Sequence, residues 1–219
     1  MVMVSLLVMI VLYSRSPNLK CVAKIHDSRI YKCRFQNQKK IMSDLQKMSK
    51  NVGLVSSSKE WNANHLTTAR ATKKNTNVPR FSRELVKTVK TLCKRLKTSE
   101  KNVVLTDPID KDNLADYWIN VYTKGHGQGA HNHMNDDTTT PFYCFTYFAK
   151  YDKAKDAPLR FYTDLEEDIP SRQRKSVTLD IDEGDIVFFP PNLEHSVDIQ
   201  TTNGPRITVS GNVYKMEPV

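Results

Sequence analysis

Three histidines in this 219-residue chain could together hold a metal ion. His131 and His133 are two residues apart, so in an extended segment from Ala130 to His133 both side chains point to the same side. His195 comes much later, after a short apolar segment and the turn that begins at Pro190. Neutral imidazole is a common ligand of iron, zinc, copper and nickel. The spacing therefore predicts a metal site built from these three histidines, although two exposed loop histidines at 131 and 133 would have the same spacing.

An arginine could supply the second half of the site. Arg206 opens the last apolar segment of the chain, with Thr208 on the same face. Burying a guanidinium is costly unless a carboxylate pairs with it. If Arg206 is buried, it predicts an acidic ligand close to the metal, whereas on an edge strand it would be an ordinary surface arginine.

Short segments rich in aromatic and β-branched residues must position these side chains. Their apolar residues recur with a period of two, and turn residues separate most of them. So many short strands after a helical start predict a mainly β fold, a double-stranded β-helix or jelly roll, and not alternating β and α units. The predicted strands are Tyr117–Thr123, Phe142–Phe148, Leu159–Thr163, Val177–Ile181, Ile186–Phe189, Ser196–Gln200 and Arg206–Tyr214.

The chain divides into an extension and one domain. Residues 1–40 are an apolar and then basic extension, and residues 41–219 form the domain. Within the domain we expect a helical prelude over 41–104 and the β-helix core over 105–216.

Two helices are predicted in the prelude. Ser43 can cap a short helix that runs to about Lys50. After Pro79, Ser82 is a candidate N-cap, and Phe81 could pack against Val86 as a hydrophobic staple. One apolar stripe of this second helix should pack on the sheet; it consists of Leu85, Val86, Val89, Leu92 and Leu96.

The N-terminal segment Met1–Tyr13 is almost entirely apolar, but it is shorter than the roughly 20 residues that cross a bilayer. No basic residue precedes it and several follow it, which argues against a signal peptide. It could be a short membrane anchor, a buried strand or helix, or upstream sequence included by a doubtful start codon. The four cysteines lack CxxC spacing, which indicates reduced thiols. We therefore expect a cytoplasmic protein.

Charge is distributed unevenly along the chain. Residues 1–101 contain 22 Lys and Arg against 5 Asp and Glu, whereas the remaining residues contain 11 against 19. Such asymmetry can indicate contact with a polyanion through the basic N-terminal half. A solvated basic lid over an acidic barrel would give the same pattern.

Four motifs stand out in the second half of the chain: Trp118-x-Asn120-x-Tyr122-x-Lys124-Gly125, Gln128-x-x-His131-x-His133, Gly184–Pro190 followed by His195, and Arg206–Asn212. Together they resemble the 2-oxoglutarate- and iron(II)-dependent oxygenases found in viral and microbial genomes. The resemblance extends roughly from Ser43 to Tyr214 and is most specific in its second half.

This resemblance implies a double-stranded β-helix that holds iron with a His-x-Asp/Glu pair and a distal histidine. Carried over by motif, His131 and His195 become iron ligands, Arg206 anchors the 2-oxoglutarate co-substrate, and Thr208 assists it. The implied activity is a dioxygenase that hydroxylates a substrate and releases succinate and carbon dioxide. Tyr122 could add a hydrogen bond to the co-substrate. The substrate could be a protein side chain, a nucleic acid or a small molecule.

The chain departs from the family pattern at one ligand. His133 stands where the family has a carboxylate, so the third ligand is either His133 or one of Asp136 and Asp137. Three neutral ligands would leave the site one negative charge short.

The same segments also resemble cupins, with Asp137 in place of a glutamate and His195 at the expected distance from Pro190. The cupin pattern lacks its closing glycines and asparagine here and gives Arg206 no role. A cupin-like metal-binding protein, a dioxygenase without 2-oxoglutarate, and a non-catalytic jelly-roll accessory protein are the alternatives to the oxygenase.

Overall fold

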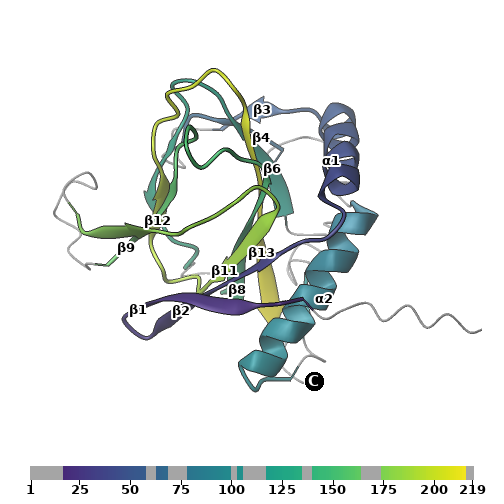
Figure 1. Ribbon diagram of the computed structural model, residues 1–219, viewed down its shortest axis with the longest axis vertical. Helices are drawn as coiled ribbons and strands as arrows, with labels where there is room; N and C mark the ends of the chain where they lie inside the picture. The colour runs from purple at the N-terminus through teal and green to yellow at the C-terminus, as the bar shows by residue number, and fades with distance from the viewer. Residues whose placement is uncertain are drawn as a thin grey trace, which may run out of the picture.

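Two antiparallel sheets lie face to face, and two helices cover the outer side of the larger one (Figure 1). The computed structural model describes residues 17–57, 63–68, 78–99, 103–105, 117–134, 140–163 and 174–215. Within these residues the predicted mainly β jelly roll is confirmed, and a strand overlaps each of the seven predicted ones, although β10, Ser176–Thr178, and β12, His195–Val197, end three residues earlier than predicted.

The larger sheet has the strand order β1-β2-β11-β8-β13-β6-β4-β3, and β5 pairs with β13 beside this path. Its long central strands are antiparallel to their neighbours, which is typical of a jelly roll. The strands are β1 Lys20–Ile25, β2 Ser28–Arg34, β3 Val55–Ser56, β4 Leu66–Thr67, β5 Val103–Val104, β6 Tyr117–Tyr122, β8 Tyr143–Lys150, β11 Asp185–Phe189 and β13 Arg206–Lys215.

The smaller sheet has the order β10-β9-β12-β7. Its strands are β7 Gln128–His131, β9 Leu159–Tyr162, β10 Ser176–Thr178 and β12 His195–Val197. Strand β12 pairs with β7 on one side and β9 on the other, which places the second and third motifs of the sequence next to each other.

Strand β11 shows how the two cores are built. It is buried on both faces, and successive side chains point to opposite sides of the sheet. Ile186 and Phe188 belong to the core beneath the helices, whereas Val187 and Phe189 belong to the core between the sheets. This explains why the segment is a continuous apolar run and not an alternating one.

Helix α1, Gln38–Val52, begins earlier than predicted. Ser43 is not its cap but lies inside the helix, which starts after Asn37. Asn37 adopts a left-handed conformation with φ 59°, and its carbonyl accepts hydrogen bonds from the amides of Lys40 and Ile41. A left-handed asparagine turns the chain into the helix without a side-chain cap, so the usual capping pattern did not reveal it.

Helix α2, Pro79–Arg95, also starts before its predicted cap. The amide of Ser82 donates to the carbonyl of Val78, so Ser82 lies in the first turn of the helix. The predicted staple is wrong as well, because Phe81 is fully buried while Val86 is 39% exposed. The rest of the stripe is confirmed: Leu85, Val89 and Leu92 are buried against the sheet, and Leu96 is partly buried there.

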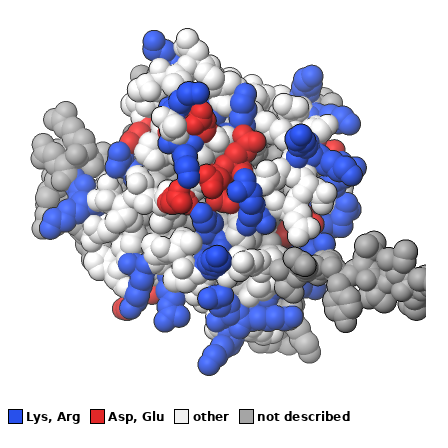
Figure 2. Space-filling model, in the orientation of Figure 1, with Lys and Arg blue, Asp and Glu red and all other residues white. Residues whose placement is uncertain are grey.

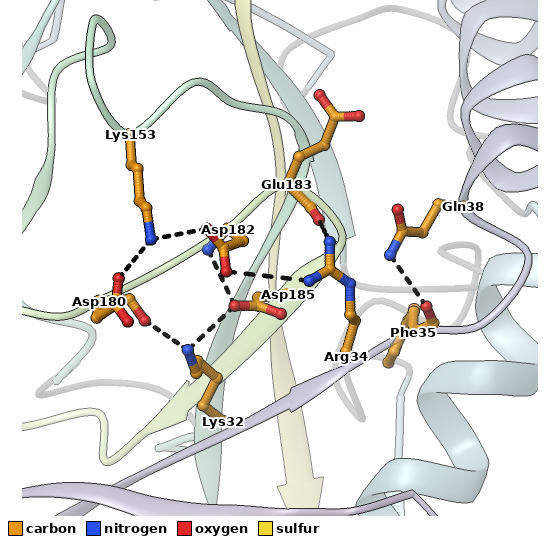
Figure 3. Close-up of polar contacts among 9 residues, drawn as sticks. All are labelled: Lys32, Arg34, Phe35, Gln38, Lys153, Asp180, Asp182, Glu183 and Asp185. Atoms are coloured by element: carbon orange, nitrogen blue, oxygen red, sulfur yellow. Dashed lines mark hydrogen bonds and ion pairs between the residues drawn. The ribbon is translucent and has the colours of Figure 1, made fainter.

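Strands β1 and β2 form a hairpin within the segment that the sequence leaves without a defined element. Strand β2 extends the large sheet by pairing with β11. Figure 3 shows the ion pairs that hold this edge: Lys32 lies 3.2 Å from Asp185, and Arg34 lies 4.0 Å from Asp182. Lys153, 3.0 Å from Asp182, extends the same network.

Residues 1–13, with the membrane anchor that the sequence leaves open, lie outside the described residues. Neither described helix combines the length and apolarity that spanning a membrane would require. The four cysteines all lie within the described residues and form no disulfide with one another.

Candidate metal and co-substrate site

The three predicted histidines lie together between the two sheets. His131 ends strand β7 and is paired directly with His195 on β12, and the ring centroids of these two residues are 4.2 Å apart. His133 follows two residues after the end of β7, with its ring 5.2 Å from that of His195. One ring nitrogen from each residue falls within 4.8 Å of the others. The structure therefore brings all three candidate ligands to one point.

Each imidazole is held in the orientation that a metal ligand requires. The Nδ1 atom of each ring lies beside an oxygen that can only accept a hydrogen bond, so Nδ1 carries the proton and donates. Nε2 then keeps its lone pair for a metal. The acceptors for His131, His133 and His195 are Gly129 O, Asn212 Oδ1 and Leu193 O, each at 3.0 Å.

Burial keeps the three rings neutral. It lowers the pKa of His195 well below 6.5 and that of His133 to about 4, in each case helped by a neighbouring histidine of the cluster. The pKa of His131 is lowered for the same reason. Neutral imidazole is the form that binds iron, so this donor set fits the metal that the motifs predict.

Gln128 forms a hydrogen bond with Nε2 of His131, the nitrogen that would bind the metal. Its side-chain nitrogen lies 3.2 Å from His131 Nε2, and its side-chain oxygen accepts a hydrogen bond of 3.1 Å from the Tyr122 hydroxyl. A metal bound to His131 would have to displace this amide. Gln128 is part of the second sequence motif, but the spacing alone gave it no role.

Arg206 is completely buried, and its guanidinium nitrogens have no hydrogen-bond partner among the described residues. The guanidinium packs against aromatic rings, with its carbon 4.8 Å from the Tyr122 ring centroid and 5.4 Å from that of Phe148. Burial lowers the pKa of Arg206. A desolvated cation with free donors is a site for an anion.

The histidines and Arg206 line one cavity of about 30 Å³, which is enough for about two water molecules. Thr208 and Tyr122, the other predicted co-substrate residues, line the same cavity. A dicarboxylate would need some of these side chains to move aside. Gln128 also lines the cavity and contacts both Tyr122 and His131, so it is the first candidate to move.

A buried polar group behind the cavity escaped the sequence analysis. His65 stacks on Tyr122, with ring centroids 4.5 Å apart, and its Nε2 lies 3.0 Å from the side-chain oxygen of Asn120. The same oxygen accepts a hydrogen bond of 2.9 Å from Thr67. His65 and Thr67 lie in an irregular part of the sequence with no motif, so only the fold reveals that they support the wall of the site.

Asp136 and Asp137, the alternatives to His133 as third ligand, lie outside the described residues. The stretch that the structure does describe provides His133, whose ring stacks on Trp118 at 6.4 Å and bonds to Asn212.

The match to known families falls on the part of the chain that builds the site. Residues 116–212 match the family described as "Putative 2OG-Fe(II) oxygenase". No curated protein matches the chain in sequence.

Solved structures share the fold at low sequence identity. A Pseudomonas putida prolyl-4-hydroxylase is 10% identical over 85% of this chain and 92% of its own, with a TM-score of 0.54. The viral collagen prolyl hydroxylase of Paramecium bursaria Chlorella virus-1 is 14% identical over 85% and 96%, with a TM-score of 0.51. HygX from Streptomyces hygroscopicus, solved with nickel, 2-oxoglutarate and hygromycin B, is 12% identical over 86% and 83%, with a TM-score of 0.53.

The cofactor and co-substrate of the matched family, iron(II) and 2-oxoglutarate, fit the imidazole cluster and the buried cation of this cavity. The residues that build the site, 116–212, match the 2OG-Fe(II) oxygenase family, and this match indicates an iron(II)- and 2-oxoglutarate-dependent oxidoreductase.

Proposed function

We propose that His131, His133 and His195 hold the iron, that Arg206 binds the distal carboxylate of 2-oxoglutarate, and that the enzyme hydroxylates a C–H bond of its substrate. The observation that carries this proposal is the buried guanidinium of Arg206, which lacks a hydrogen-bond partner in the described structure and lines the same cavity as the three imidazoles. Iron(II) and 2-oxoglutarate, when bound, would supply the oxidising chemistry with molecular oxygen as the oxidant: one oxygen atom enters succinate as 2-oxoglutarate loses carbon dioxide, and the other enters the C–H bond of the substrate.

The histidines bind through Nε2 and stay oriented through Nδ1. Two of them donate to backbone carbonyls close to them in sequence, which ties their rings to the loops that carry them. His133 donates to Asn212 on strand β13 instead. Such partners of the ligands fix the ring plane and the tautomer before the metal arrives.

Arg206 gives the cavity its preference for a dianion. Its planar guanidinium can donate two parallel hydrogen bonds to one carboxylate. Thr208 lies two residues further along β13 and lines the same cavity, so its hydroxyl can bond the same carboxylate. Tyr122 is within reach once Gln128 releases its hydroxyl. We assign these three residues to the co-substrate.

Apolar side chains close the remaining walls. Phe145, Leu159 and Phe189 line the cavity and are buried in the two cores. They exclude water from the reacting groups, and this strengthens the attraction between Arg206 and a carboxylate.

His133 in place of a carboxylate alters the charge of the site. Three imidazoles bring no negative charge, so the metal keeps more of its positive charge for the dianionic co-substrate. Because Arg206 is also cationic, the whole cavity favours anions more than one with a carboxylate ligand would.

The test measures iron stoichiometry and the conversion of 2-oxoglutarate to succinate. We expect His195→Ala to lose both, and Arg206→Ala to keep iron but to raise the KM for 2-oxoglutarate at least tenfold. Two exposed residues of the β1–β2 hairpin provide matched controls, His26→Asn and Arg29→Ala, which should behave as the wild type. Turnover that survives in His195→Ala would refute the proposal. Metal binding without succinate formation would instead indicate a cupin-like protein.

A further inference from the structure

Helix α2 carries a basic stripe on the side that faces away from the sheet. Successive side chains of a helix are rotated by 100° around its axis, so the basic residues of α2 fall within one narrow sector of the helix surface. This sector lies opposite Leu85 and Leu92, which are fully buried. All members of the stripe are exposed. We call this stripe the α2 basic face; it consists of Arg83, Lys87, Lys90 and Lys94.

The charge around this face is nearly all positive. Residues 78–99 contain seven Lys and Arg and one acidic residue, Glu84, which lies 3.4 Å from Lys87. Strand β2 is different, because its Lys32 and Arg34 are matched by acidic side chains (Figure 3). In Figure 2 the acidic side chains gather near the centre of the view, while the lower edge, where α2 ends in Figure 1, carries mostly Lys and Arg.

The first described residues of the chain lie beside the end of helix α2. The carbonyl of Leu19 accepts a hydrogen bond of 2.7 Å from Arg95 at the end of α2, and Leu19 is buried in the same core as Leu92. Twelve of the first thirteen residues are apolar. An apolar segment therefore precedes the point in the chain that is fixed to the basic helix.

We propose that the α2 basic face binds the surface of a membrane that contains anionic lipid. A basic patch and a short apolar segment are each weak membrane signals, and stable attachment generally takes two such signals together. A single-stranded nucleic acid would be expected to stack on aromatic side chains, but the exposed apolar neighbour of this face on α2 is Val86. The observations therefore favour lipid over nucleic acid.

This face lies apart from the cavity of the oxygenase. Helix α2 packs on the outer side of the large sheet, whereas the imidazole cluster and Arg206 lie between the two sheets. The proposed contact thus determines where the enzyme works and leaves its chemistry unchanged, and it can be tested without turnover.

The full chain is sedimented with vesicles of phosphatidylcholine alone or with about one-third phosphatidylserine added. We expect binding that requires phosphatidylserine and weakens as salt is raised. Each charge removed from the face should weaken binding about fivefold. The triple variant Arg83→Glu, Lys87→Glu and Lys90→Glu should therefore lose more than about a hundredfold in affinity.

The matched control reverses three exposed lysines outside α2, Lys24, Lys124 and Lys150, and so changes the net charge equally. Circular dichroism confirms that both triple variants are folded. Binding that is retained by the control and lost in the α2 variant supports the proposal. It is overturned by equal losses in both variants, by equal binding to vesicles without phosphatidylserine, or by a higher affinity for duplex or single-stranded nucleic acid that depends on the same face.

Discussion

His133 Nδ1 lies 3.0 Å from the side-chain oxygen of Asn212, whereas the Nδ1 atoms of His131 and His195 face backbone carbonyls. A backbone carbonyl cannot be removed by substitution, but Asn212 can. His133 is therefore the proposed ligand whose orientation depends on another side chain. It also stands where the family pattern has a carboxylate.

We predict that Asn212→Ala lowers the affinity for iron(II) by about 10- to 100-fold, because the ring of His133 loses the partner that fixes its tautomer. Asn212→Asp keeps an acceptor at this position and should retain most of the affinity. Anaerobic titration with iron(II) measures both. Asn203→Ala, on an exposed loop, is the control. An unchanged affinity in Asn212→Ala would show that His133 does not bind the metal.

Arg206→Met should stabilise the protein in the absence of 2-oxoglutarate. The substitution removes a fully buried cation without a hydrogen-bond partner in the described structure and fills the space with an apolar side chain. By analogy with buried charged groups replaced by apolar ones, we expect a gain of about 1–4 kcal/mol in the free energy of unfolding, measured with urea.

Arg174→Met is the matched comparison, and it should lower the free energy of unfolding, whereas Arg206→Met should raise it. The Arg174 side chain is also buried, but it lies 2.8 Å from the carboxylate of Glu194 and 4.6 Å from the ring of Tyr162. Its loss leaves Glu194 without this partner and should destabilise the fold by about 1–3 kcal/mol. Stabilisation by both substitutions would mean that burial alone, and not the missing anion, determines the effect at Arg206.

Gln128 should compete with the metal for His131. Its amide donates to the same nitrogen that would bind iron, at 3.2 Å. Replacing it with methionine removes a hydrogen bond worth about 0.5–1.5 kcal/mol, so the affinity for iron(II) should rise by up to about tenfold. The same titration measures this change. A fall in affinity would indicate that Gln128 positions His131 and does not block it.

His65 should make stability depend on pH. Burial lowers its pKa to about 4 in the folded protein, from an ordinary value of 6.5. Above pH 6.5 both the folded and the unfolded chain are neutral at this residue. As the pH falls from 6.5 towards 4, the unfolded chain binds a proton that the folded chain does not, so stability falls by about 1.4 kcal/mol per unit.

His65→Gln removes this contribution. The free energy of unfolding of the wild type and of this variant is measured with urea at each pH. The difference between the two proteins should shrink as the pH falls from 6.5 to 4, by at most about 3 kcal/mol. The measurement is made on metal-free protein, so that proton competition at the iron ligands does not enter. A difference that stays constant over this range would show that His65 is protonated equally in both states.

The core strands could be predicted because their residues leave little choice. In β11 the run from Ile186 to Phe189 is buried on both faces, and in β13 and β6 the aromatic and β-branched residues also exclude a loop. The hairpin of β1 and β2 could not be predicted in this way. Most side chains of β1 are exposed or half-buried, and the ion pairs of β2 join it to residues far along the chain.

The candidate metal ligands and Arg206 could be singled out because their order and spacing match the motifs of a known family. Their supporting residues could not. Asn212 and His65 are ordinary polar residues until the sheet brings them beside His133 and Tyr122. No rule of spacing could have predicted a contact that depends on the register of three or four strands.

If His131 and His195 hold iron as proposed, their direct pairing across β7 and β12 links iron uptake to the accuracy of folding. A slip of one residue between these strands would turn one of the two imidazoles to the outer surface of the small sheet. Only molecules with the native alignment could then retain the ion, so newly made chains that load iron would be those whose sheets had closed correctly.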